Sequence, residues 1–445
     1  MQMRENHDLI EVPKIETPFT IDDGPYASDA QRMHMRWADD NSVFLSRGGR
    51  GRFEAMNIGS LASLLHPDAS SSEDIQRIAD WCAWLLLRDD RWDATEAPKE
   101  WQHLAERDQS YLQLMRRMPG ESTVQRGDYD EDEGLYRALA DLCSRLRTRA
   151  LKEDGPDPIN RRLVSVMKSF FFASIRETSY QHSGTCPTLP DYIKMRSVTG
   201  GLDILTFVHA ALDGIRLPKS LLATPTIRRL TEASHNVCCW HNDLVSLNKK
   251  IINGEVQNLI LVLQHDPECP CRRLPEAVEA AVEMIHQEIG TFVELQQEIQ
   301  AIQGFRGHAA NWYAQMLRNR VGDVIGWQEV CAARYQESFV VGKPMSQSLI
   351  GNGSIYEEHS RSCALGFFSR LTCSNEFAMV GLENSRDSER YDPGGFSSET
   401  PPGSSGHPNV EILNLTWILG VMQWCALAFA LFSGAALLDV YSRES

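Results

Sequence analysis

Apolar residues recur at spacings of three and four along most of the chain between residues 61 and 340. That period is typical of amphipathic α-helices, and runs that alternate apolar and polar residues are few. The clearest helical run, PEAVEAAVEMIHQEIGTFVELQQEIQAI, covers residues 275–302, and another begins at NWYAQMLRNRVGDVIGW. We therefore expect an all-α fold of ten or more helices, preceded over residues 1–60 by a strap with short helices.

The composition is that of a globular protein. Of 445 residues, 42% are apolar and 23% charged, which is enough to build and solvate a core. The net charge of −16 argues against a nucleic-acid partner. The N-terminus lacks the apolar core of a signal peptide, so we expect a cytoplasmic protein with reduced cysteines. One cluster, His265 with Cys269 and Cys271, is a weak candidate metal site, and a loop between helices is favoured instead.

The C-terminal part has a different character. Residues 346–411 are rich in Ser, Gly and Pro and predict a mostly disordered linker. The segment 412–440 is apolar, without a charge from Ile412 to Leu438, and as a helix would rise about 40 Å. That length suits a transmembrane anchor. A buried core or oligomer helix, or non-coding sequence translated at the 3′ end of a faulty gene model, would also account for it.

The first chemical signal is the sequence DDRWD, residues 89–93, at the end of an apolar run that follows a predicted N-cap at Ser71-Ser72. On a helix, Asp89 and Asp93 lie four residues apart and share one face. Two carboxylates on one face suit Mg²⁺, which prefers oxygen ligands together with waters and phosphate oxygens. Taken alone, the same pattern also fits a solvated helix end.

The second signal is NDLVSLNKK, residues 242–250. Asn242, Ser246 and position 250 fall at i, i+4 and i+8 and so share one helix face. Two neutral oxygen ligands there, with a third ligand one turn on, would form a second Mg²⁺ site. A polar helix stripe is the alternative interpretation.

Together these motifs resemble those of the class I terpene synthases of bacteria and fungi, over roughly residues 13–345. DDRWD resembles the aspartate-rich motif of that family. NDLVSLNKK resembles its second metal motif, N-D-x-x-S-x-x-K-E, and GEVQNLI resembles its downstream G-[DE]-x-x-N pattern. Tyr192 and Arg196 resemble its Y-x-x-x-R-x-x-T segment, and Arg334-Tyr335 its C-terminal Arg-Tyr pair. All lie in the family's order and at its spacing.

The resemblance implies a catalytic domain over residues 1–345, built as a helical bundle around a deep apolar cavity. It implies three Mg²⁺ ions that bridge the two motifs to a substrate diphosphate. The implied metal ligands are Asp89, Asp93, Asn242 and Ser246. The implied diphosphate-binding residues are Arg196, Lys249, Arg334 and Tyr335. Catalytic roles fall to Arg196 as the diphosphate sensor, to Thr199 and Gly200 at a helix break whose carbonyl faces the cation, and to Trp312 on the cavity wall.

The implied activity is that of a lyase which ionises a linear prenyl diphosphate and cyclises the carbocation. Farnesyl diphosphate, and hence a sesquiterpene product, is expected because single-domain chains of this type most often make sesquiterpenes. Geranyl and geranylgeranyl diphosphates remain alternatives. A chain-elongating prenyltransferase is a minor one, because the second motif is not aspartate-rich.

Position 250 departs from the family pattern, because Lys250 stands where the family has a metal-binding Glu. An ammonium cannot bind Mg²⁺ and repels it. Glu255 is five positions on, about 140° round a continuous helix, and is therefore expected to be a poor substitute. The competing hypothesis is a catalytically impaired relative that binds prenyl diphosphate or acts as a membrane-tethered interaction protein. Leu85 and Leu86, where many relatives have phenylalanine, are expected to affect the product only.

Overall fold

The computed structural model of the chain describes residues 10–19, 24, 26–44, 47–93, 100–116, 133–151, 158–269, 271–301, 308–331 and 340–341. All of them belong to one compact unit. The boundaries expected at residues 345 and 411, and the segment 412–440, lie outside the described residues and stay predictions. No helix among the described residues is long and apolar enough to cross a membrane.

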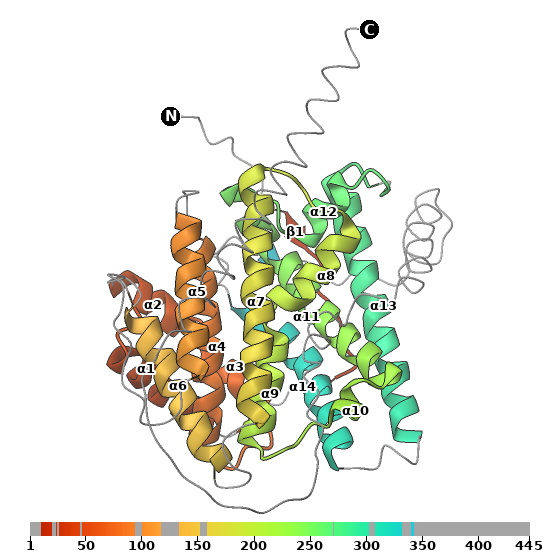
Figure 1. The fold of residues 1–445 in the computed structure, drawn as a ribbon. Helices are drawn as coiled ribbons and strands as arrows, with labels where there is room; N and C mark the ends of the chain where they lie inside the picture. The colour runs from red at the N-terminus through yellow and green to blue at the C-terminus, as the bar shows by residue number, and fades with distance from the viewer. Residues whose placement is uncertain are drawn as a thin grey trace, which may run out of the picture. The chain divides into compact units, whose positions relative to one another are not determined.

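The described part of the chain is helical almost throughout, as the apolar period predicts (Figure 1). The helices are α1 (Ala27–Asp40), α2 (Arg47–Ala55), α3 (Ile58–Leu65), α4 (Ser72–Asp93), α5 (Glu100–Arg116), α6 (Glu133–Leu151), α7 (Pro158–Ser183), α8 (Leu189–Thr199), α9 (Leu202–Leu212), α10 (Lys219–Leu222), α11 (Pro225–Asn253), α12 (Leu259–His265), α13 (Leu274–Ala301) and α14 (His308–Val330). Two short strands, β1 (Glu11–Val12) and β2 (Val340–Val341), pair in parallel. The all-α prediction is confirmed.

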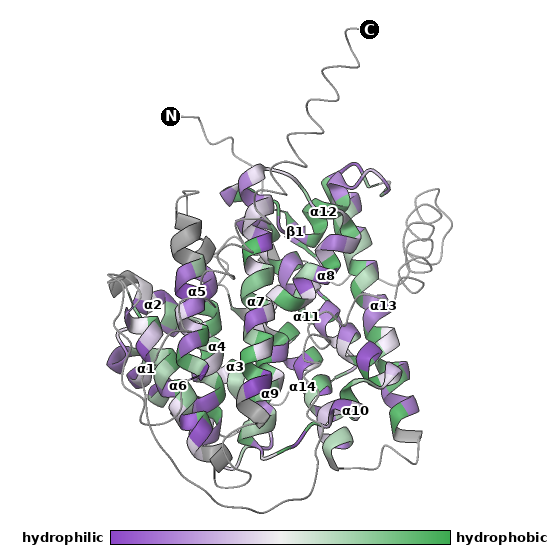
Figure 2. Ribbon diagram, viewed as in Figure 1, coloured by the Kyte–Doolittle hydropathy of each residue, from purple (hydrophilic) through white to green (hydrophobic). Residues whose placement is uncertain are grey.

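Helix α11 is the centre of the bundle. It packs against α8, α12, α13 and α14, and most of its residues beyond Ile227 are buried. Helices α5 and α7 stand side by side, and α13 lies on the opposite side of the bundle from α5 (Figure 1). Along these outer helices hydrophilic and hydrophobic residues alternate in short blocks (Figure 2). This is the pattern of helices that bury one face and solvate the other.

Helix α4, which carries the first motif, begins where the sequence predicts. The backbone N–H of Asp74 donates to the hydroxyl oxygen of Ser71 at 3.3 Å, so Ser71 is the N-cap. Glu73 and Asp74 place negative charge in the first turn, where the helix dipole favours it. The apolar run that follows is core, with Trp81 and Trp84 buried.

The N-terminal strap is fastened across the central helix. Ile10 donates its backbone N–H to Asn248 Oδ1 at 2.9 Å, and Asn248 Nδ2 donates back to the Ile10 carbonyl at 2.8 Å. Further along the strap, Phe19 packs edge-on against Phe292 of α13. A strap with short helices over residues 1–60 is thus confirmed where the structure describes it, and it closes over the helix that carries the second motif.

The two motif helices run toward the same end of the bundle. Along α7, Arg88 of α4 donates to Ser174 at 2.9 Å, and Gln181, a little further on, donates to the carbonyl of Gly254 at the end of α11 at 3.2 Å. The C-terminal ends of α4 and α11, which carry the two motifs, therefore both lie near the C-terminal half of α7.

Candidate active site

Asp243 is the junction at which three sequence motifs meet. Its carboxylate accepts hydrogen bonds from the Tyr192 hydroxyl at 2.6 Å, from Arg196 Nε at 3.0 Å and from the backbone N–H of Leu259 at 3.2 Å. Its own carbonyl accepts from Asn258 Nδ2 at 2.6 Å. The side chain is 2% exposed, so this charge is buried and held by charge-assisted hydrogen bonds.

Arg196 joins this junction to the second motif. Its Nη2 donates to Asn242 Oδ1 at 2.8 Å, while its Nε holds Asp243. Burial, the largest single effect, would lower the pKa of Arg196, but Asp243 and the other groups around the guanidinium together raise the pKa well above the usual value. For Tyr192, burial first and Asp243 second raise the pKa well above its usual value. Arg196 is therefore a fixed positive charge beside Asn242.

The helix break expected after Arg196 is present. Helix α8 ends at Thr199, and Gly201 adopts φ of +68° before α9 begins. Only glycine tolerates that conformation without strain. A Cβ on Gly200 would lie 2.5 Å from Cys239 Sγ of α11, so the backbone there presses directly on that helix. The hydroxyl of Thr199 is buried and has no described hydrogen-bond partner.

The break lies between the two motif helices. On one side it meets Cys239 of α11, and on the other Leu85 of α4 lies 3.6 Å from the position a Cβ on Gly201 would take. Asn242 comes one turn after Cys239, and Asp89 one turn after Leu85. Helices α4 and α11 run toward the same end of the bundle. The two motifs therefore lie on either side of the break at residues 199–201.

The structure describes some of the remaining predicted site residues and not others. Asp89 lies half-buried in the last turns of α4, which ends at Asp93; the side chain of Asp93 is not described. Ser246 and Lys249 are buried on α11. Arg334 and Tyr335 lie outside the described residues, and their diphosphate role stays a prediction.

Trp312 lies toward the other end of the bundle. Helix α14 runs parallel to α11, as the contacts of Tyr313 with Thr231 and of Gln328 with His241 establish. Trp312 is thus level with Thr231, about 16 Å along the helix axis from Asn242. Its indole N–H donates to Asp213 Oδ2 at 2.7 Å. A role on the cavity wall stays a prediction, at some distance from the motifs.

The expectation that Glu255 is far from position 250 is wrong. It assumed that α11 continues through residue 255, but the helix ends at Asn253, and Gly254 adopts φ of +67°. The chain therefore reverses, and Glu255 forms an ion pair with Lys250. Sequence reasoning could have found this, because a glycine just past a helix end commonly marks such a reversal.

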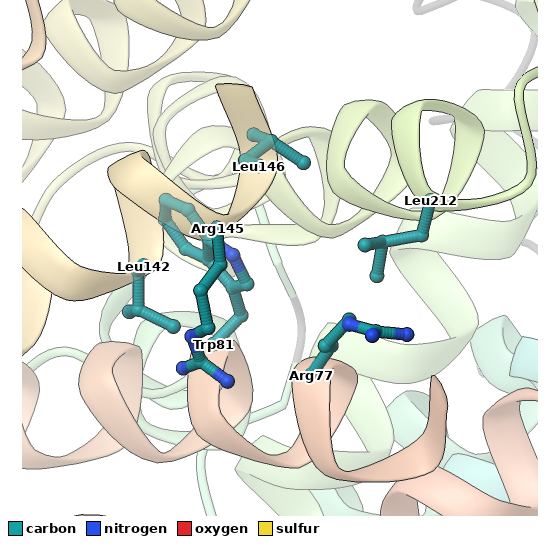
Figure 3. A pocket seen from close by; sticks show the side chains of 6 residues that line it. All are labelled: Arg77, Trp81, Leu142, Arg145, Leu146 and Leu212. Carbon is teal, nitrogen blue, oxygen red and sulfur yellow. The ribbon is translucent and has the colours of Figure 1, made fainter. Parts of the chain in front are cut away.

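Other features near the bundle do not form a second site. A small pocket between α4, α6 and the end of α9 is far along α4 from the motif (Figure 3). It is lined by Arg77, Trp81, Leu142, Arg145, Leu146 and Leu212. Cys269 and Cys271 are buried, and no group of three or more His, Cys, Asp or Glu side chains that could hold a metal occurs among the described residues.

The donor set at the motifs fits Mg²⁺ better than a softer metal. The motif residues offer the carboxylate of Asp89, the amide oxygen of Asn242 and the hydroxyl of Ser246, which are all hard oxygen donors. The described residues alone form no complete metal cage. Mg²⁺ commonly keeps waters and binds through one or two carboxylates together with substrate phosphates.

Two contributors were not singled out from the sequence. Asp243 was quoted only as a letter of the second motif, yet it binds Tyr192 and Arg196 together. Asn258 caps α12 by accepting from Ile260 N at 3.0 Å and also holds the Asp243 carbonyl. An Asn just before the apolar run LILVL is a recognisable N-cap, so part of this role was visible.

Comparison with known proteins agrees with the fold and the motifs. Residues 80–290 match the family described as terpene synthase family 2, C-terminal metal binding. Solved structures of similar fold include α-eudesmol synthase, at a TM-score of 0.58 and 19% identity over 73% of this chain and 98% of that one. A linalool/nerolidol synthase from Streptomyces clavuligerus also has a TM-score of 0.58, at 17% identity over 71% of this chain and 100% of that one. Over residues 80–290 the chain is therefore similar to the terpene synthases, and its fold is that of the solved terpene synthase structures.

The curated relatives include bacterial terpene synthases. A (+)-T-muurolol synthase of Roseiflexus castenholzii, described as farnesyl diphosphate cyclizing, is 29% identical over 62% of this chain and 79% of its own. A germacrene A synthase of Nostoc punctiforme is 23% identical over 64% of this chain and 84% of its own. Both relatives are named as terpene synthases.

Proposed function

We propose that the chain is a Mg²⁺-dependent cyclase that converts farnesyl diphosphate into a cyclic sesquiterpene and releases diphosphate. The observation that carries the proposal is the Arg196 junction. It fixes a permanently charged guanidinium beside Asn242, at the break flanked by both motif helices. The farnesyl chain length is supported by the relatives, two of which are described as farnesyl diphosphate cyclizing.

Bound Mg²⁺ would neutralise the diphosphate and make it a better leaving group, with Asp89, Asp93, Asn242 and Ser246 as its protein ligands. Arg196 binds the same diphosphate. Its two described hydrogen bonds use two of its five N–H donors, which leaves donors of the same planar fork for phosphate oxygens. Lys249, Arg334 and Tyr335 are proposed to add further hydrogen bonds to it.

The Thr199–Gly200 segment is proposed to face the carbocation. The place that a Cβ on Gly200 would take is filled by Cys239 of α11, so this turn packs closely on the helix that carries the second motif. The buried Thr199 hydroxyl is a polar group at the same break. Apolar walls exclude water that would quench the cation, and Trp312 is the proposed aromatic surface deeper in the bundle.

A second candidate function rests on Lys250. An ammonium in place of a metal-binding carboxylate favours an impaired relative that binds prenyl diphosphate without efficient turnover. Both candidates keep the Arg196 junction, because each would bind diphosphate through Arg196, so turnover is what distinguishes them.

The test is a product analysis of the full-length protein. Geranyl, farnesyl and geranylgeranyl diphosphates are offered separately with MgCl₂, and the extracts are analysed by gas chromatography with mass spectrometry. We expect a cyclic product from farnesyl diphosphate that disappears when EDTA removes the metal. Diphosphate binding without product from any of the three would favour the impaired relative.

A further inference from the structure

The end of α11 is a Schellman turn built on position 250. The backbone N–H of Glu255 donates to the Lys250 carbonyl at 2.9 Å, and that of Gly254 donates to the Ile251 carbonyl at 3.1 Å. In this turn the residue after the left-handed glycine lies against the residue five positions earlier. The backbone itself therefore brings the side chains at 250 and 255 together, whatever residue stands at 250.

The contact at this turn is polar instead of the usual apolar one. Glu255 Oε2 forms an ion pair with the Lys250 ammonium, and Asn253 Nδ2 donates to Glu255 Oε1 at 3.0 Å. The two charged side chains are only 18% and 13% exposed. The carboxylate of Glu255 is thus held, largely out of solvent, beside Lys250. Position 250 is the one at which the second motif lacks a carboxylate.

The turn is anchored from outside α11, which fixes where this carboxylate lies. Gln181 of α7 donates to the Gly254 carbonyl at 3.2 Å, and its Oε1 accepts the backbone N–H of Val256 at 2.9 Å. One glutamine side chain therefore clamps the residues on both sides of Glu255.

We propose that Glu255 supplies the carboxylate that position 250 lacks and serves as a ligand of the Mg²⁺ held by Asn242 and Ser246. Position 250 shares a helix face with those two residues, and a carboxylate offers about four lone-pair sites, of which the described bonds use two. Lys250 stays beside it and opposes the metal charge, so this chain binds Mg²⁺ despite the lysine. The inference rests on the proposed function.

The test measures the Mg²⁺-dependent binding of pyrophosphate and does not depend on turnover. Inorganic pyrophosphate is titrated by calorimetry into the full-length protein at a series of MgCl₂ concentrations. Glu255→Gln should weaken Mg²⁺-dependent binding about tenfold or more, as loss of a metal-site partner does. Lys250→Met, which removes the opposing charge, should strengthen it. Glu294→Gln, an exposed glutamate of α13, is the matched control and should change nothing.

The exchanged pair Lys250→Glu with Glu255→Lys makes the test decisive. It keeps the ion pair and one carboxylate at the turn, so we expect binding within about threefold of the natural protein. A tenfold gain in the exchanged variant, or unchanged binding in a folded Glu255→Gln protein, would overturn the assignment of Glu255. If the natural protein nevertheless makes product with Mg²⁺, the proposed function stands. If the natural protein shows neither product nor Mg²⁺-dependent binding, the proposed function and this assignment both fail.

Discussion

The two motif helices differ in how deeply their motifs are built into the fold. On α11, Asp243 is buried and holds Tyr192, Arg196 and the start of α12. On α4, Asp89 and Asp90 lie half-buried in the last turns of the helix. The α11 motif is therefore part of the core as well as of the proposed site, whereas the α4 motif lies nearer the surface. We therefore expect replacement of Asp89 to remove function without unfolding the protein, and replacement of Asp243 to destabilise the fold as well.

The largest expected effect is that of Asp243→Asn. The change leaves the buried Arg196 guanidinium without its counter-charge, which costs about 3 kcal/mol or more of unfolding free energy. Product formation should be lost with it. Denaturant unfolding measures the first effect, with Asp90→Asn as control, for which a change within about 0.5 kcal/mol is expected. A loss below about 1 kcal/mol for Asp243→Asn would mean that the junction is not structural.

Asp89→Ala should abolish most product formation and leave the stability of the fold nearly unchanged. We expect at least about a hundredfold loss of product formation, because a proposed metal ligand is removed. The unfolding free energy should stay within about 0.5 kcal/mol, since a negative charge in the last turn of a helix is not stabilising. The measurement pairs turnover with denaturant unfolding. Full activity in the Asp89→Ala variant would show that Asp89 of α4 is not a metal ligand.

The region around α11 should also respond to acid. Burial lowers the pKa of His235 to about 4 and that of His209 well below its usual 6.5. Below pH 6.5 the unfolded chain therefore binds more protons than the folded one, so stability falls as the pH falls. Each histidine contributes about 1 kcal/mol between pH 6.5 and 5.5.

Thermal unfolding across that range measures the acid effect. Replacing His209 and His235 by Leu should flatten the slope of stability against pH. An unchanged slope in the double variant would assign the acid response to other groups.

Tyr192→Phe is the mildest change to the junction. It removes one hydrogen bond from a buried carboxylate, and Asp243 keeps its bonds from Arg196 and Leu259. We expect a loss of about 1 kcal/mol in unfolding free energy and a several-fold loss of turnover. The same denaturant titration checks it. An effect as large as that of Asp243→Asn would show that the hydroxyl, and not the arginine, stabilises the carboxylate.

Much of the fold could be predicted from the sequence, because apolar period and helix caps are local signals. The cap at Ser71 and the run that became α13 are examples. The break after Arg196 came from the family resemblance and its glycines. What could not be predicted was contact between distant segments, such as the strap residue Ile10 on Asn248. The prediction for Glu255 was wrong because it extended a helix past the glycine that ends it.

The most direct test of the whole site is a crystal structure of the full-length protein with Mn²⁺ and inorganic pyrophosphate, with the ions located by anomalous scattering. We predict pyrophosphate at Arg196, and Mn²⁺ bound from both helices, by Asp89 on one side and by Asn242, Ser246 and Glu255 on the other. Ions bound only at α4, or pyrophosphate bound away from Arg196, would contradict the account.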